Sequence, residues 1–144
     1  MTHHDEGHYA MKHPPGTVLD KDIAQRVQAS VNDGRITCRS AHRIAGECGV
    51  EPKDVGIAID LLEVRIAGCQ LGLYGYGSKG RVVKPAPEVS PELEAAIGES
   101  LVDGRLTCRA SWDIAEQFGI TRMEISAACE TLKIRITACQ LGSF

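Results

Sequence analysis

The sequence predicts a mainly α-helical protein with small β elements, built from two tandem copies of one unit. A gapless internal repeat is the first reason: residues 33–72 align with residues 103–142 at an offset of seventy, with 17 of 40 positions identical. Helical periodicity of apolar residues recurs in three segments of each copy. Two short alternating runs in each copy are typical of strands. A tandem pair of similar domains explains all three features.

Length and composition agree with two small folded units. A chain of 144 residues with 43% hydrophobic and 24% charged residues has the composition of an ordinary globular protein. Two long copies are too few for a solenoid, which stacks three or more short units. We therefore expect a flexible, histidine-containing arm over residues 1–16, a first unit over 17–85 and a second unit over 86–144.

The first helix of each copy is short and amphipathic. Its apolar residues recur at intervals of four, and a turn at Asp-Gly ends it at residues 33–34 and 103–104. The positions that define the two apolar faces are Ile23, Val27 and Val31 in the first copy and Leu93, Ile97 and Leu101 in the second.

A minimal strand and a second helix follow in each copy. The strands are expected at 35–37 and 105–107, and the threonine that ends each strand can cap the next helix. The second helices are expected at about 38–48 and 108–118, where Gly49 and Gly119 end them.

The third helix begins differently in the two copies. Pro52 suits a first helical turn, whereas Thr121 and Glu124 form a capping box. These helices should end near Leu62 and Leu132. Alternating runs at 64–66 and 134–136 then predict a second strand in each copy.

The order and spacing of these elements resemble the winged helix-turn-helix family. In each copy a small residue is followed four positions later by glycine and ten positions later by a β-branched residue, as in Ala45, Gly49 and Val55. Ala115, Gly119 and Ile125 repeat that spacing. The resemblance covers about 100 of the 144 residues and implies two tandem winged helix-turn-helix domains. It assigns the wing of the first unit to the glycine-rich stretch after residue 72, with a return strand near 81–84, and a truncated wing to the second.

That resemblance implies a DNA-binding transcriptional regulator, in which the third helix enters the major groove and the wing lies on the backbone. Charge favours the first unit as the nucleic-acid face, because residues 20–85 carry ten Lys/Arg against eight Asp/Glu and residues 86–144 carry five against nine. The candidate contacts are the basic residues Arg39, Arg43, Lys53, Lys79, Arg81 and Lys84, with Arg122 in the second unit.

A protein-interaction or assembly module with the same fold is the alternative. The third helices carry few base-reading side chains and present small residues, such as Gly56 and Ala58 in the first copy and Ser126 and Ala127 in the second. Small faces suit close packing against another unit, a protein partner or a second copy of the chain. A metal- or redox-responsive accessory role is compatible with either function.

Four of the six cysteines occupy equivalent positions in the two copies: Cys38, Cys69, Cys108 and Cys139. If the strand before the second helix lies beside the strand after the third, Cys38 approaches Cys69 and Cys108 approaches Cys139. That geometry permits a redox pair or half of a metal site, and it equally permits four small core residues. The repeated Cys-Gln-Leu-Gly quartet is interpreted as part of the strand that closes each core, with the glutamine amide holding a turn.

The arm contributes a second candidate set of metal ligands, His3, His4 and His8, beside acidic residues, although such arms are usually only solvated. No cofactor is expected. No catalytic triad, carboxylate dyad or phosphate loop recurs in both copies, so we do not expect an enzyme. Gly75, Gly77 and Gly80 lack the strand and helix that a dinucleotide site requires. The sequence shows neither a secretion signal nor an apolar membrane span, and we expect a cytoplasmic protein.

Overall fold

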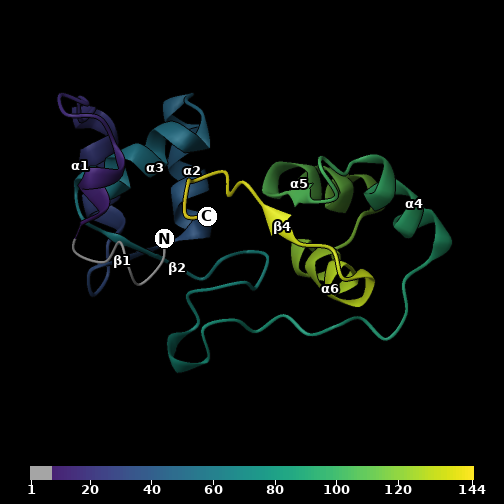
Figure 1. Cartoon of the computed structure of the whole chain (residues 1–144). Helices are drawn as coiled ribbons and strands as arrows, with labels where there is room; N and C mark the ends of the chain where they lie inside the picture. The colour runs from purple at the N-terminus through teal and green to yellow at the C-terminus, as the bar shows by residue number, and fades with distance from the viewer. Residues whose placement is uncertain (1–7) are drawn as a thin grey trace. The chain divides into compact units, whose positions relative to one another are not determined.

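The computed structural model describes residues 8–144, and this part of the chain is mainly helical, with six α-helices and four short strands (Figure 1). Its contacts divide it into two compact units. Unit 1 runs to Cys69 and also includes Gln140–Phe144, and unit 2 comprises Gln70–Cys139. The sequence predicted a boundary near residue 85, on the expectation that each unit is one continuous stretch of chain.

The described part of unit 1 begins with a short 3₁₀ helix and contains three α-helices and two strands. In chain order these are η2 (Tyr9–Lys12), α1 (Lys21–Ser30), β1 (Arg35–Thr37), α2 (Cys38–Cys48), α3 (Pro52–Leu61) and β2 (Arg65–Ala67). The arm was expected to be flexible to residue 16. Residues 9–12 instead form a helix, and the Tyr9 side chain is buried.

Unit 2 repeats the order helix, strand, helix, helix, strand. It contains η3 (Gly77–Lys79), α4 (Pro91–Glu99), β3 (Leu106–Thr107), α5 (Cys108–Phe118), α6 (Arg122–Leu132) and β4 (Ile136–Thr137). The second helices, α2 and α5, have the predicted bounds in both units. β1 also has the predicted bounds, β3 begins one residue later than predicted, and β2 and β4 are displaced by one or two residues.

Local side-chain chemistry explains the helix ends. The hydroxyl of Thr37 accepts the backbone N–H of Ser40 at 3.0 Å, which satisfies a donor in the first turn of α2. Gly49 ends that helix with a φ of 64°, a left-handed conformation that glycine adopts without steric cost. Thr121 and Glu124 cap α6 reciprocally, as the sequence predicts.

A tight turn joins the first helix to the first strand in each unit. In unit 1 the two central residues, Asp33 and Gly34, both have positive φ, and Asn32 and Arg35 exchange backbone hydrogen bonds across them. Two consecutive positive φ values are those of a type I′ turn, which favours Asx-Gly. The Asp-Gly signal at 103–104 gives the same geometry in unit 2.

Each unit contains a two-stranded parallel sheet. β1 pairs with β2 with Ile36 opposite Ile66, and β3 pairs with β4 with Leu106 opposite Ile136. The prediction that the strand before the second helix lies beside the strand after the third is therefore confirmed. Parallel pairing requires a crossover, and the second and third helices supply it.

The predicted return strand of the first wing does not form among the described residues. Val82 and Val83 both donate their backbone N–H to the carbonyl of Gly72 at 2.8 and 3.2 Å, so neither is available for a strand ladder. The Cys-Gln-Leu-Gly quartet is also not a strand: β2 and β4 end before it, and Gln70–Leu71 and Gln140–Leu141 form turns. That interpretation was wrong because each strand is only two or three residues long, and a turn begins three residues after the strand ends.

The interior of each unit is aliphatic. Val27, Ile36, Ile44, Ile59 and Ile66 are almost completely buried in unit 1, as are Ile97, Leu106 and Ile125 in unit 2. Ala45 and Val55 are buried where α2 and α3 pack together, in agreement with the predicted helix-turn-helix spacing. Among residues 8–144, no helix combines the length and the apolarity that crossing a membrane requires.

Candidate functional site

The third helix of each unit is the element that a helix-turn-helix protein would use for recognition, and in both units most of its residues are buried or half-buried. In α3 only Lys53 and Asp54, in the first turn, are exposed. In α6 the exposed residues are Glu124 and Thr131, at opposite ends of the helix. Most of each third helix is therefore packed against other parts of the protein.

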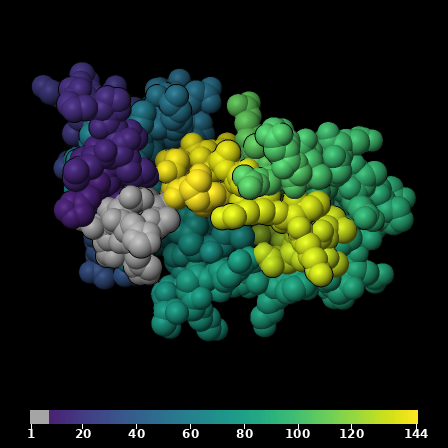
Figure 2. Space-filling view, in the orientation of Figure 1, coloured from purple at the N-terminus to yellow at the C-terminus, as the bar shows by residue number. Residues whose placement is uncertain are grey.

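The middle of α3 forms a seat for the segment Gln140–Phe144, which belongs to unit 1. A Cβ atom at Gly56 would collide with the carbonyl oxygen of Leu141 and would lie 2.8 Å from its carbonyl carbon. The side chain of Leu141 is 2% exposed, and Ser143 is also buried. Only glycine at position 56 lets the backbone of this segment approach so closely. In Figure 2 the last residues, in the deepest yellow, lie beside the blue atoms of the α2–α3 region.

The 3₁₀ helix η2 holds the same segment from the side. The Lys12 ammonium donates to the carbonyl oxygen of Gly142 at 3.0 Å and lies 3.2 Å from a carboxylate oxygen of Asp60 on α3. His13 Nε2 lies 2.8 Å from that Asp60 oxygen. Asp60 is nearly fully buried, and its other oxygen, Oδ1, has no hydrogen-bond partner among residues 8–144.

A second acidic residue, just after α3, positions η2 itself. The carboxylate of Glu63 accepts the backbone N–H groups of Tyr9 and Ala10, both at 2.9 Å. A negative charge at the start of a helix satisfies its unpaired donors. Residues 9–13 are therefore held against the C-terminal end of α3 by two carboxylates.

In unit 2 the equivalent segment, Gln70–Gly72, lies against α6. The amide oxygen of Gln70 accepts a hydrogen bond from the Arg122 guanidinium, and that guanidinium stacks on Trp112 of α5, 3.6 Å from the ring centroid. A Cβ atom at Gly72 would lie 3.1 Å from the methyl carbon of Met123. Leu71, between these contacts, is 1% exposed. The Gln70 side-chain amide thus bonds to Arg122 of α6, whereas the sequence predicted that this amide would hold a turn.

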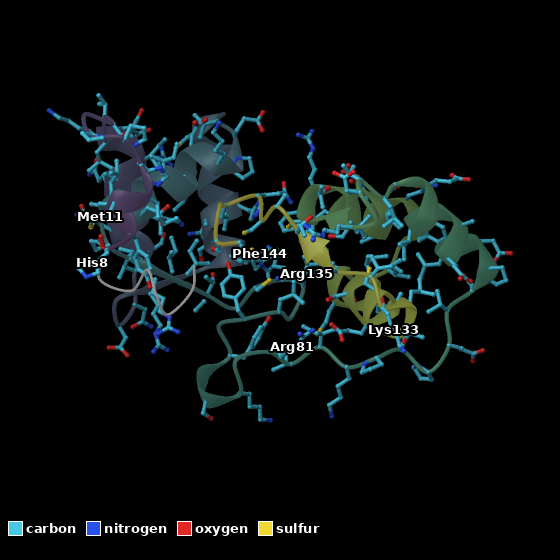
Figure 3. All side chains as sticks on the ribbon, in the orientation of Figure 1. His8, Met11, Arg81, Lys133, Arg135 and Phe144 are labelled. Atoms are coloured by element: carbon cyan, nitrogen blue, oxygen red, sulfur yellow. The ribbon has the colours of Figure 1, made fainter. Side chains whose placement is uncertain are left out.

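The segment between η3 and α4 covers a further part of α6. Ala86 donates its N–H to the carbonyl of Ala127 at 3.0 Å, and Thr131 donates its hydroxyl to the carbonyl of Ala86 at 2.6 Å. Figure 3 shows Arg81 on this segment, and its guanidinium pairs with Glu130 of α6. These contacts leave little of α6 accessible to another molecule.

The seven candidate nucleic-acid residues divide into two groups. Six are exposed, all but Arg122. Four of these lie outside the ion pairs of the described residues: Arg39 in the first turn of α2, Lys53 in the first turn of α3, Lys79 in η3, and Lys84. The other three are engaged by side chains of the protein. Arg43 pairs with Glu47 at 3.3 Å, Arg81 pairs with Glu130, and Arg122 is held between Gln70 and Trp112.

The repeated cysteines lie where the strand pairing predicts. Cys38 and Cys69 follow the paired strands β1 and β2, and Cys108 and Cys139 follow β3 and β4. The first three are buried and Cys139 is half-buried. Within residues 8–144 no three His, Cys, Asp or Glu side chains are grouped so as to hold a metal ion. The described cysteines therefore offer at most a pair of thiols in each unit.

Of the histidines proposed as metal ligands, His3 and His4 lie outside the described residues. His8 is exposed, and Figure 3 shows it beside Met11 at the edge of the protein. The informative histidine is His13, which the sequence groups with the other histidines of the arm; only the fold brings it to Asp60. The role of Gly56 could have been inferred from the sequence, because a glycine inside a helix lowers its stability and indicates close packing at that position.

No protein-family model matches this chain, and no curated protein or solved structure matches it.

Proposed function

We propose that this chain is a non-enzymatic protein-interaction module made of two helix-turn-helix units with reduced wings. Each unit uses its third helix to hold a short segment that contains Gln-Leu-Gly. The observation that carries this proposal is the close approach of Leu141 to Gly56, where the backbone of one segment lies directly on the helix. A helix that is occupied in this way serves protein contacts.

The exposed surface of the third helices argues against reading of base edges. A recognition helix must enter a groove about 12 Å wide and present several side chains to the bases. Only the first turn of α3 is exposed, and there Lys53 is followed by Asp54, whose negative charge repels a phosphate. In α6 the Arg122 guanidinium already stacks on Trp112. Neither helix offers an exposed row of base-reading groups.

DNA-binding transcriptional regulation is the second candidate, and one observation favours it. Arg39, Lys53, Lys79 and Lys84 are all exposed, in a stretch of sequence with a net positive charge. Such residues bind phosphates rather than bases, so the affinity would be salt-dependent and largely independent of sequence.

Fluorescence anisotropy with mixed duplexes at low and moderate salt separates the two candidates. We expect no saturable binding at low salt and a stoichiometric protein complex when the full chain is isolated under the same conditions. Saturable binding that the joint replacement of Lys79 and Lys84 by alanine weakens, with a log–log salt slope reduced by about one unit per lost phosphate contact, would establish the DNA-binding candidate instead.

A further inference from the structure

The segment that packs on Gly56, residues 140–144, is not part of the continuous stretch of chain that forms the rest of unit 1. Unit 1 includes the chain up to Cys69 and then only Gln140–Phe144. These last residues directly follow Cys139, which belongs to unit 2. One peptide bond, between residues 139 and 140, therefore connects the segment to the rest of the chain.

Unit 2 shows the reciprocal arrangement. Gln70–Gly72 directly follows Cys69 of unit 1 but is held on α6 by the bond from Arg122 and by packing against Met123. Each Gln-Leu-Gly segment therefore occupies the unit that did not supply the preceding strand. The chain is built by an exchange of equivalent segments between its two repeats.

We propose that the seat beside Gly56 also accepts residues 140–144 of a second copy of this chain, so that two chains dimerise by exchanging these segments. This inference rests on the proposed interaction role and names its partner. The seat recognises the buried Leu141 side chain and two carbonyl oxygens, one against Gly56 and one bonded by Lys12. The segment of a second chain carries the same leucine side chain and the same two carbonyl oxygens, so it can form every one of these contacts.

Concentration decides which copy supplies the segment. A tethered segment competes at an effective concentration of the order of mM, so the monomer dominates at micromolar protein. Exchange of an identical element is nevertheless a low-cost route to a dimer, because the contacts within each unit are the same in both states. Refolding at high concentration, when seats and segments meet before the chain closes on itself, should populate the dimer.

The test is to unfold the full chain in urea under reducing conditions, refold it over a range from about 10 µM to about 1 mM, the upper limit set by that effective concentration, and measure mass by light scattering after size exclusion. We expect a dimer whose share rises with concentration. Equal mixtures of isotope-labelled and unlabelled chains should give mixed dimers in native mass spectrometry only when they are refolded together.

Two substitutions assign the dimer to this seat. Gly56→Leu blocks the seat and Leu141→Asp disables the segment. Because either change leaves open monomers in which no segment is seated, each should lower the dimer share about tenfold or more. Gly46→Leu is the matched control, because that helical glycine of α2 is exposed and a Cβ atom added there meets nothing within 4 Å. If circular dichroism shows that Gly56→Leu or Leu141→Asp is unfolded, Gly56→Ala and Leu141→Ala replace them.

A chain that stays monomeric at every concentration overturns the inference, and so does a dimer that Gly56→Leu and Gly46→Leu affect equally. Neither result decides the proposed function. A monomeric chain that forms a stoichiometric complex with a different protein retains the interaction role without self-exchange, whereas a monomeric chain that binds only duplex DNA loses both.

Discussion

The two units hold equivalent segments on their third helices through different contacts. Both hold a Gln-Leu-Gly segment against the third helix, and both bury the leucine of that segment. Unit 1 places Gly56 under the backbone of the segment, whereas Ser126 occupies the equivalent position in unit 2. Unit 2 instead holds its segment by side chains, chiefly Arg122. Close contact with the backbone of the segment requires glycine at position 56. Contact through side chains, as in unit 2, is possible with several residue types.

The acidic residues beside the two segments also differ between the units. Asp60 is buried and is approached by Lys12 and His13, while its counterpart Glu130 is half-buried and pairs with Arg81. A buried carboxylate depends on its partners far more than a hydrated one does. Unit 1 should therefore be the more sensitive of the two to substitution at equivalent positions.

Alanine at three small helical residues should give the sharpest contrast. Gly56→Ala should lower the free energy of unfolding by about 1–3 kcal/mol, because the new methyl group collides with the Leu141 backbone. Gly46→Ala should raise it by about 0.5–1 kcal/mol, because the methyl group meets open space and the helix loses a glycine. Ser126→Ala should change little, since the buried hydroxyl has no partner among the described residues. Urea titrations followed by circular dichroism measure all three; equal effects at positions 56 and 46 would refute the seat.

Neutralising the two equivalent carboxylates should also separate the units. Asp60→Asn should cost about 2 kcal/mol, within the range for a hydrogen-bonded charge that is lost from a buried site. Glu130→Gln should cost less than about 1 kcal/mol, because its pair with Arg81 is partly exposed. The same urea titrations measure both values, and a larger loss for Glu130→Gln would reverse the comparison.

The stacked guanidinium is specific to unit 2 and should contribute a smaller amount. Arg122→Lys should cost about 1 kcal/mol, because lysine keeps the charge but loses the planar stacking on Trp112 and the geometry of the bond to Gln70. Arg109→Lys, at an exposed position on the neighbouring helix α5, is the control and should be neutral. Equal urea midpoints for the two variants would show that the stacking on Trp112 does not contribute to stability.

The smallest expected effect is a dependence on alkaline pH that comes from the Cys129 thiol of unit 2. Burial raises the pKa of the Cys129 thiol to about 11, and the nearby charge of Glu130 adds to the shift. A group with a raised folded pKa contributes its full stability below the unfolded value of 9.0 and loses it as pH rises through 11. Cys129→Ala should therefore flatten the fall in unfolding free energy between pH 9 and 11; an unchanged slope would exclude Cys129 as its cause.

Sequence reasoning was most successful where a local signal determines the structure. Caps at Thr37 and Thr107 and left-handed glycines at 49 and 119 define α2 and α5 to the residue. The repeat, however, suggested that each Cys-Gln-Leu-Gly quartet closes its own unit. Sequence similarity between two copies cannot tell whether a segment packs on its own copy or on the other, because both seats accept the same residues.

The site was less predictable than the fold for a related reason. Exposure of Arg39 and Lys53 follows from helix periodicity, but the ion pair of Arg81 with Glu130 and the approach of His13 to Asp60 join residues about fifty positions apart. No local pattern encodes such pairs. The small residues of the third helices were correctly noted, and the structure adds that a segment of the chain lies on them.

Hydrogen exchange in two single variants tests the reciprocal seating of the segments most directly. Leu141→Asp should increase amide exchange along Pro52–Leu61 and leave Arg122–Leu132 unchanged, because Leu141 packs in unit 1; Leu71→Asp should have the opposite effect. The measurement uses the full chain at micromolar concentration with peptide-resolved mass spectrometry. Faster exchange of α6 in Leu141→Asp and of α3 in Leu71→Asp would contradict the exchange of segments and return each one to its own repeat.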